Sequence, residues 1–485
     1  MALSQEESAL INQLSMRHDQ EIPELELLDR YYEGTQPLSY MHPEIYREVA
    51  DRIKPVIVFW PQLVVGSREE RLDIEGFRMP GDEAADKELW RIWQANDMVE
   101  GSSMAHVDSL VMRRSYVCVG TNEDDPATPL ITVESPLELY ADIDPRTRKI
   151  RAALRRVNDV DPSGAIGGRA ATLYLPNETI WCEWDGGWKE TARDVHGVGE
   201  VLVTPLVNRQ RLRGATRTPR NLAVERLGRS ELDPIIPLSD AVCKLATDMM
   251  VSAEFVAIPL RALFGVGPDA FQDEQGNPMS ALKAMLGRML TIPDEDVKAF
   301  EFAAAQLANF GAGIRELAQM VSAVGALPPD YLGYSSNNPA SAEAGRVAET
   351  RLIKRCERII EARKPNWRRV QRHVMRLKDG KFDPDLVLLE TDFRDPSTPT
   401  VAAAADAAVK LYSTQPRPIV PLRQTREDLR YTPGQIERME AEDDKAAAAD
   451  PMREIVNQMG AGRIGDQPAP NGGPPAREPV PAGVG

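Results

Sequence analysis

The chain lacks the features that mark membrane and secreted proteins. In its 485 residues, no run approaches the roughly 18 consecutive apolar residues that span a bilayer. Its first residues carry no basic segment followed by an apolar stretch, so we expect no signal peptide. Ser4 and Glu7 instead have the spacing of a capping box, which predicts that a helix begins here.

Cysteine and histidine are scarce and scattered. The 4 cysteines form no CxxC pair and the 5 histidines form no HExxH motif. This spacing excludes the common zinc sites and a disulfide framework, so we expect buried free thiols and neither metal nor cofactor. The residues are Cys118, Cys182, Cys243, Cys356, His18, His42, His106, His196 and His373.

Catalytic motifs are missing as well. The chain contains no GxxxxGK[ST], no GxSxG, no kinase motif set and no GxGxxG that opens a helix after a strand. Asp142 and Asp144 could in principle bind a metal, but with Pro145 after them they are more typical of a turn. We therefore predict that the protein is not an enzyme and name no catalytic residue.

The charge is strongly acidic. Lys and Arg number 58 and Asp and Glu number 74, so the formal net charge is 58 − 74 = −16. This balance argues against a protein that holds nucleic acid on a basic surface. It leaves open a protein along which nucleic acid passes without sticking, because like charges repel.

The first part of the chain alternates between helical and extended patterns. We predict a helix over residues 1–30, two helices within 83–112 with Met104 on an apolar face, and mainly antiparallel strands between 115 and 206. Residues 54–66 fit either a strand or a helix. A hairpin is indicated at 184–188, where two glycines lie between tryptophans.

Two strongly periodic helices follow, over residues 235–256 and 303–324. Between them, residues 257–302 are broken by glycine and proline, which indicates a compact inserted module with a short helix near 280–290. The apolar stripes of the two helices predict packing against each other or against other subunits. The stripe residues are Leu238, Val242, Leu245, Met249, Leu307, Phe310, Ile314, Leu317 and Val321.

A segment with little regular-structure propensity joins these helices to a long one. Residues 325–341 include Leu327, Pro328, Pro329, Asp330, Tyr331, Ser335, Ser336, Asn337 and Asn338. The long helix follows over roughly 339–378, and Pro365 should kink it because proline removes one backbone hydrogen bond. We expect a strand within 383–393, helices within 399–448, and a disordered tail over 451–485.

Arginines gather in two places. Five lie between residues 208 and 221, where a solvated loop and a contact with phosphate or an acidic neighbour both remain open. Nine arginines, together with Lys364, line the long helix between 346 and 376. They indicate either a solvated, salt-bridged surface or packing against an acidic neighbouring subunit.

The order of these parts resembles the portal proteins of tailed bacteriophages, of the type found in phages of actinobacteria within the SPP1/HK97-like portal family. The matching motifs are Leu89 to Asp97 with Tyr116 to Gly120, Ile236 to Asp240 with Ala253 to Phe255, Leu327 to Gly333 with Asn338 to Ala344, and Tyr431 to Met439. The resemblance covers roughly residues 20–445.

The resemblance implies a mainly helical α+β portal fold with wing, stem, clip and crown. Residues 1–234 and 342–392 would form the wing, 235–256 and 303–324 the stem helices, and 257–302 the clip. Residues 325–341 would form the tunnel loop of the DNA channel, and 393–450 the crown. The subunit would close a ring, typically a dodecamer, at one capsid vertex of the virion, after assembly in the host cytoplasm.

Double-stranded DNA would pass through this ring during packaging and ejection. The implied partners are the terminase large subunit, a head–tail adaptor, and the major capsid and scaffold proteins, with no membrane involved. The competing interpretation is another ring-forming virion protein, an adaptor or scaffold without a DNA channel. A hydrolase with an unrecognised motif is a third.

Overall fold

The computed structural model describes residues 3–37, 55–82, 85–144, 146–160, 166–209, 228–256, 261–264, 289–292, 300–301, 307–333, 342–381, 383–397, 401–412, 419–429, 431 and 433–448. The chain divides into two units, 1–397 and 398–485. The described residues mix long helices with mostly antiparallel sheets, which confirms the α+β class.

Helix α1 (Gln5–Glu33) begins at the predicted capping box. The Ser4 hydroxyl accepts the Glu7 N–H at 3.1 Å, and the Glu7 carboxylate accepts the Ser4 N–H at 2.7 Å. Gly34 ends the helix with a φ of 70°, a conformation that glycine adopts without steric penalty. The ambiguous segment after it contains helix α3 (Trp60–Glu69), in which Pro61 lies in the first turn.

Helices α4 (Lys87–Ala95) and α5 (Met98–Val111) occupy the predicted pair of positions. Asp86 caps α4 by accepting the N–H groups of Glu88 and Leu89, both at 2.9 Å. The apolar role predicted for Met104 is wrong, because its side chain is 56% exposed.

The antiparallel region between residues 115 and 206 is confirmed. It forms a three-stranded sheet in the order β3-β2-β9 and a five-stranded sheet in the order β4-β5-β6-β7-β8. The predicted hairpin pairs Trp184 with Trp188, and Gly186 has a φ of 67° in its turn. The strands are β2 (Arg114–Gly120), β3 (Leu130–Glu134), β4 (Leu139–Ile143), β5 (Ile150–Val160), β6 (Ile166–Tyr174), β7 (Thr179–Trp184), β8 (Trp188–Asp194) and β9 (Val203–Val207).

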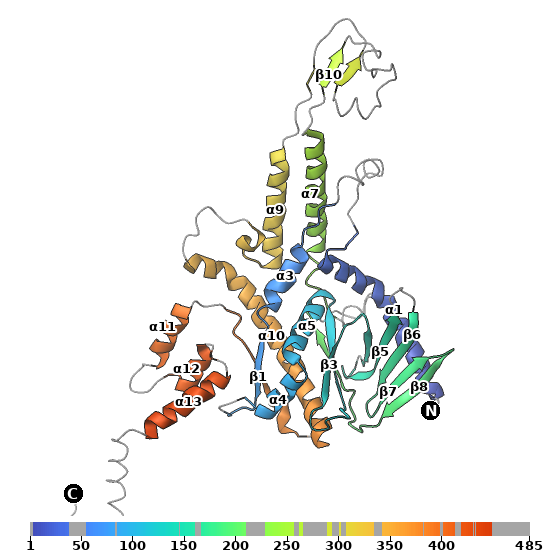
Figure 1. Ribbon diagram of the computed structural model, residues 1–485, viewed down its shortest axis with the longest axis vertical. Helices are drawn as coiled ribbons and strands as arrows, with labels where there is room; N and C mark the ends of the chain where they lie inside the picture. The colour runs from blue at the N-terminus through green and yellow to red at the C-terminus, as the bar shows by residue number, and fades with distance from the viewer. Residues whose placement is uncertain are drawn as a thin grey trace, which may run out of the picture. The chain divides into compact units, whose positions relative to one another are not determined.

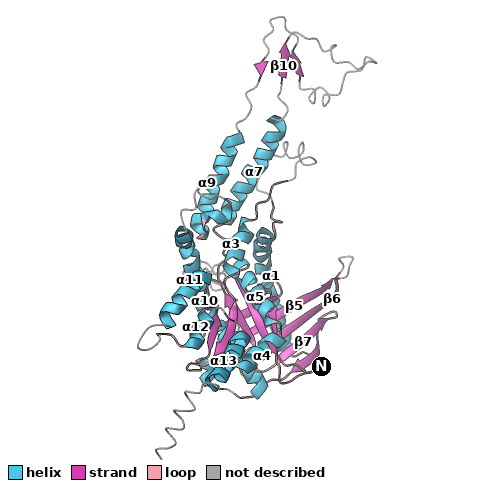
Figure 2. Ribbon diagram, turned by 60° about the vertical axis from the view of Figure 1, so that its left-hand side comes forward, coloured by secondary structure: helices cyan, strands magenta, loops and turns pink. Residues whose placement is uncertain are grey.

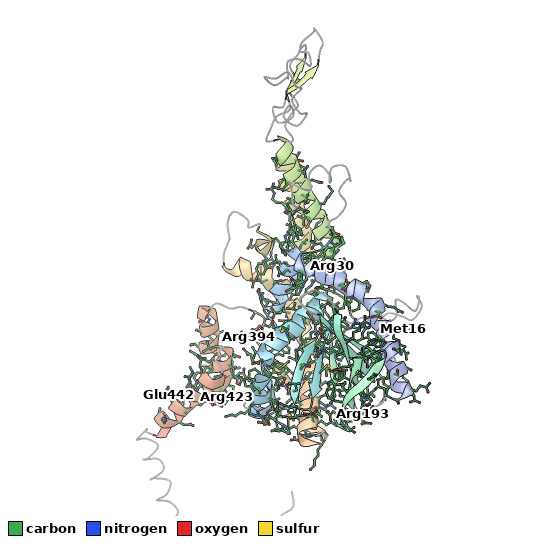
Figure 3. All side chains as sticks on the ribbon, turned by 45° about the vertical axis from the view of Figure 1, so that its right-hand side comes forward. Met16, Arg30, Arg193, Arg394, Arg423 and Glu442 are labelled. Carbon is green, nitrogen blue, oxygen red and sulfur yellow. The ribbon has the colours of Figure 1, made fainter. Side chains whose placement is uncertain are left out.

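Helix α1 covers one face of the five-stranded sheet (Figures 1 and 2). Ile11 and Leu14 are buried against apolar side chains of the central strands. At the sheet edge, Arg193 of β8, labelled in Figure 3, contacts Glu7, Glu178 and Glu190 at 2.7–2.9 Å. Its guanidinium lowers the pKa of the Glu7 carboxyl to about 2. The start of α1 is therefore fastened to the last strand of the sheet.

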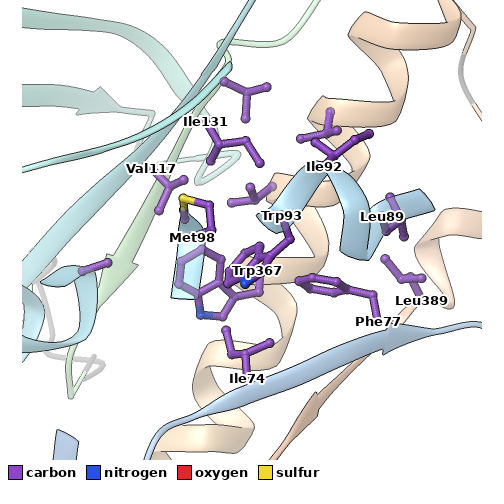
Figure 4. Close-up of a cluster of buried hydrophobic side chains, with 14 of the residues drawn as sticks. Ile74, Phe77, Leu89, Ile92, Trp93, Met98, Val117, Ile131, Trp367 and Leu389 are labelled. Carbon is purple, nitrogen blue, oxygen red and sulfur yellow. The ribbon is translucent and has the colours of Figure 1, made fainter. Parts of the chain in front are cut away.

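The main core lies where α4 and α5 meet the long helix α10 (Ala342–Asp379) (Figure 4). Trp93 and Trp367 are both fully buried, with ring centroids 5.2 Å apart in an edge-to-face arrangement. Strand β1 (Ile74–Arg78) pairs antiparallel with β13 (Glu390–Phe393) beside this core. Strand β1 was not predicted, whereas β13 falls inside the predicted segment. A short 3-10 turn, η3 (Asp385–Val387), precedes β13.

Helix α7 (Ile236–Val256) and helix α9 (Leu307–Gly325) flank the inserted module. The described part of the module is a three-stranded sheet in the order β11-β10-β12, with β10 (Arg261–Phe264), β11 (Met289–Ile292) and β12 (Phe300–Glu301). The short helix expected near 280–290 lies mostly outside the described residues, and its last two positions begin strand β11 instead.

The described residues of the second unit form three helices, α11 (Val401–Tyr412), α12 (Leu422–Asp428) and α13 (Pro433–Ala448), in the predicted segment. Ile436 is 2% exposed and Ala408 is 5% exposed. Arg423 pairs with Glu440 at 2.9 Å across α12 and α13. The tail predicted to be disordered lies outside the described residues.

All four cysteines are free and buried, as predicted. None of the helices within the described ranges is both long and apolar enough to span a bilayer.

Candidate functional site: the helix pair and the connection after it

Helices α7 and α9 lie side by side in both ribbon views (Figures 1 and 2). We call the end that contains Ile236 and Gly325 the root of the pair. Near it, Val242 and Val321 are fully buried and Ala318 is 1% exposed. They belong to a core cluster that also contains Trp60, Val64, Ile235, Cys243, Leu327, Leu332, Leu352 and Cys356. The root is therefore packed against α3 and α10.

The other predicted stripe residues are less enclosed. Leu238, Ile314 and Leu317 are partly buried and pack against the root cluster. Leu245, Met249, Leu307 and Phe310 are also partly buried but do not belong to it. Other apolar side chains of the pair are more open: Met250 is 47%, Met320 48% and Val324 38% exposed. The pair thus retains accessible apolar surface in the single subunit.

The two glycines of α9 differ in their surroundings. A Cβ atom placed on Gly313 would lie 2.9 Å from Cδ2 of Leu245, whereas one on Gly311 would meet nothing within 4 Å. Gly313 therefore permits close approach of α7 and α9, and Gly311 has no such role in the subunit.

Arginines bind the C-terminal carbonyl groups of α9. Arg351 donates to the Ala323 carbonyl at 2.7 Å, and Arg355 donates to Val324 at 3.0 Å and Gly325 at 3.1 Å. The last carbonyls of a helix have no partner within it and carry partial negative charge, so cations there are favourable. Arg351 is exposed and Arg355 forms an ion pair with Glu231 at 4.0 Å, in line with the solvated, salt-bridged alternative, and both residues also cap another helix of the same chain.

A buried ion cluster lies beside this cap. Arg68 and Glu231 are both 1% exposed at the side chain and 3.2 Å apart, and Arg68 also donates to the Gly325 carbonyl at 2.7 Å. Arg209 contacts the other Glu231 oxygen at 2.5 Å. Burial lowers the pKa of Arg68, and burial together with Arg68 lowers the pKa of Arg355 to about 10. For Arg209, the acidic neighbour is therefore found within the same chain.

The first half of segment 325–341 is ordered against the core. Leu327 is 3% and Leu332 9% exposed, and Pro328 is buried, while Pro329 and Asp330 are exposed. Residues Pro329–Leu332 form a 3-10 turn, η2. The expectation of no regular structure is wrong there, because two buried leucines fix the turn. The predicted residues Ser335, Ser336, Asn337 and Asn338 lie outside the described part.

Tyr331 lies between three elements. Its hydroxyl accepts a hydrogen bond from Arg71 and donates one to Glu349 of α10, both at 3.0 Å. Burial raises the pKa of Tyr331, so the phenol is neutral at ordinary pH. The side chain is anchored inside the subunit at this position.

Pro365 lies inside α10, which continues as an α-helix on both sides of it. Two residues later, the Trp367 indole N–H donates to Nε2 of His106 at 3.1 Å. Burial lowers the pKa of His106 to about 3, so the imidazole is neutral and can accept this bond. The kink at Pro365 stays a prediction.

Among the described residues, no group of three or more His, Cys, Asp or Glu side chains is arranged to hold a metal ion. A small pocket near the end of α10 is lined by Glu200, Arg372, His373, Arg376, Lys381, Asp383 and Leu386, and contains no serine, threonine or cysteine.

Sequence reasoning missed four residues of this site: Arg68, Arg71, Glu231 and Glu349. The only local signal was that Arg68 and Arg71 lie three positions apart at the end of an apolar helix. Glu231 and Glu349 are ordinary acidic residues in sequence, and only the folded chain brings them to the arginines.

Comparison with known proteins identifies relatives over almost the whole described chain. The profile of a family described as "Phage portal protein, SPP1 Gp6-like" matches residues 11–448. A portal protein of Mycobacterium phage D29 is 38% identical over 400 residues, which cover 81% of this chain and 79% of that protein. A portal protein of Mycobacterium phage L5 is 36% identical over 427 residues, covering 86% and 84%.

Proposed function

Because the chain belongs to the family of SPP1 Gp6-like phage portal proteins, we propose that it is the ring-forming subunit of a channel through which double-stranded DNA enters and leaves a capsid. The observation that carries the proposal is the helix pair α7 and α9. An inserted sheet separates the two helices in sequence, and the long helix α10 follows them.

The exposed apolar side chains of this pair support a ring. Met320 and Val324 lie four residues apart on α9 and are 48% and 38% exposed, so they share one helix face. A neighbouring copy of the chain would cover this face, as helices of adjacent subunits pack around an axis. We propose twelve copies, with residues 235–256 and 303–324 as stem, 1–234 and 342–392 as wing, and 393–450 as crown.

DNA would contact the segment 325–341 and pass along an acidic wall. Ser335, Ser336, Asn337 and Asn338 are neutral and polar, so they can touch phosphates without the strong hold of lysine or arginine. The net charge of −16 would keep DNA from lodging in the channel. The clip at 257–302 would dock the terminase large subunit and then a head–tail adaptor, and the wing and crown would meet capsid and scaffold proteins.

The ring can be tested by mass and image together. Light scattering should give about twelve times the chain mass of 53.7 kDa, and negative-stain images should show a stemmed ring with a hole wide enough for duplex DNA. ATPase and nuclease assays on the purified ring should be blank. A monomer at every concentration, or a solid particle without an axial hole, would overturn the proposal.

A double substitution tests the interface itself. Met320→Asp with Val324→Asp places charges on the exposed face of α9, which should leave the subunit folded but prevent ring formation. The matched control is Met16→Asp with Leu27→Asp on α1, where the side chains are 65% and 40% exposed. If both double variants form rings equally well, this face of α9 is not between subunits.

A further inference from the structure

We propose that Tyr331 is a positioning residue whose hydroxyl latches the start of the α9–α10 connection to the body of the subunit. In this arrangement Gly333 is a fixed point from which residues 334–341 leave. The latch itself rests on contacts within one chain. Its consequence for DNA rests on the channel function proposed above.

Three elements meet at the Tyr331 hydroxyl. Arg71, which follows α3, donates to it at 3.0 Å, and the hydroxyl donates to Glu349 of α10 at 3.0 Å. Arg71 is itself held by the Ser67 carbonyl at 2.9 Å, and its side chain is 8% exposed. Arg71 and Glu349 are 3.8 Å apart, so the phenol bridges two charges that are otherwise only loosely paired. Hydrogen bonds to charged groups are stronger than neutral ones.

The backbone on the N-terminal side of Tyr331 is also tied. Ala326 has a φ of 59°, which is unusual for a residue with a side chain. The Ser322 hydroxyl donates to the Leu327 carbonyl at 2.7 Å, and the Leu327 N–H donates to the Ser322 carbonyl at 3.1 Å. Because the Leu327 side chain is also buried, the backbone that follows α9 is held in a single direction.

The turn η2 depends on such ties. A single 3-10 turn is marginal alone. At the two ends of η2, the Tyr331 N–H donates to the Pro328 carbonyl and the Gly333 N–H to the Asp330 carbonyl, both at 3.1 Å. Burial of Leu332 secures one side of the turn, and the Tyr331 hydroxyl secures the other. Removing the hydroxyl should therefore loosen the turn without unfolding the core.

The latch changes the role expected of Tyr331. Its hydroxyl already accepts one hydrogen bond and donates another, so it is not free to contact a phosphate. A force on the chain beyond Gly333 would instead be transmitted through Tyr331 to Arg71 and Glu349. The contact with DNA is then left to residues beyond Gly333.

Hydrogen exchange of the assembled protein tests the latch directly. We expect Tyr331→Phe and Glu349→Ala each to speed exchange of the Leu327, Tyr331 and Gly333 amides about fivefold to tenfold, the effect of losing one hydrogen bond. Glu349→Gln keeps an acceptor and should stay within about twofold of the unmodified chain. Tyr431→Phe removes the same atom from a tyrosine that is 40% exposed in the second unit and should change nothing.

The double variant Tyr331→Phe with Glu349→Ala separates a shared latch from two independent contacts. A shared latch predicts an effect close to that of either single change. Any of three results would overturn the proposal. They are unchanged exchange in Tyr331→Phe, an effect of Glu349→Gln equal to that of Glu349→Ala, and multiplied effects in the double variant.

DNA packaging by rings of Tyr331→Phe tests the functional consequence. We expect the amount of retained DNA to fall at least threefold, with Glu349→Gln and Tyr431→Phe like the unmodified ring and melting temperatures alike in all four. Faster exchange with unchanged packaging would keep the latch but overturn its role in the channel. If the unmodified rings never package DNA, the proposed function is refuted. Hydrogen exchange alone then decides whether the latch exists.

Discussion

The two ends of the helix pair α7 and α9 are built differently. At the root, Val242 and Val321 are fully buried, and Arg351 and Arg355 bind the last carbonyls of α9. Toward the other end, the stripe residues are only partly buried and Met250 is 47% exposed. The root is therefore stabilised within the subunit, while the far part of the pair keeps accessible apolar surface. Even at the root only one face is enclosed, because Met320 and Val324, on another face of α9, are 48% and 38% exposed.

Among the substitutions that test this comparison, we expect the largest loss of stability from removing a buried charge at the root. Glu231→Gln leaves the guanidinium of Arg68 without its counter-charge, because both side chains are 1% exposed. Breaking such a buried pair destabilises a protein by about 3–5 kcal/mol. Urea unfolding should show this loss. Glu440→Gln is the matched control: it removes one of two carboxylates beside Arg423, in a pair whose side chains are 25% and 34% exposed, and should change stability by less than about 1 kcal/mol.

A smaller difference in stability is expected between substitutions of two valines on α9. Val321 is fully buried and Val324 is 38% exposed. Val321→Ala should lower the free energy of unfolding by about 2 kcal/mol, since it removes two buried methyl groups and leaves a cavity. Val324→Ala should change it by less than about 0.5 kcal/mol in the subunit. Equal losses would mean that the root is no better packed than the exposed face.

The smallest effect concerns the glycines of α9. Gly311→Ala should stabilise the subunit by about 0.5–1 kcal/mol, because alanine favours a helix and meets no neighbour there. Gly313→Ala should gain little, since its Cβ would press on the end of the Leu245 side chain at 2.9 Å. Thermal unfolding of the two variants measures the difference. A larger gain at Gly313 would show that α7 and α9 are less closely packed than described.

The sequence predicted well those elements whose signal is local. The α7 helix was expected from residue 235 and begins at Ile236, because an apolar stripe of period 3.6 and a proline in the first turn both act within one helix. The capping box at Ser4 and the hairpin at Gly186 were found for the same reason.

Pairings between distant segments could not be predicted. Strand β1 is five residues long, contains Gly76 and gains its conformation from pairing with β13. The turn η2 appeared irregular in sequence because burial of Leu327 and Leu332, not local propensity, decides its shape. The arginines of α10 were noticed, but nothing in their spacing reveals that two of them bind carbonyl groups of α9.

The β1–β13 pairing also has a consequence for biosynthesis. Arg78 pairs with Glu390, and Trp93 packs on Trp367, so the main core needs residues from both ends of the first unit. A ribosome releases the second partner of each pair only after most of the chain has been translated. Until then Trp93 has no aromatic partner from α10. A nascent chain can therefore complete this core only after residue 393 has left the ribosome.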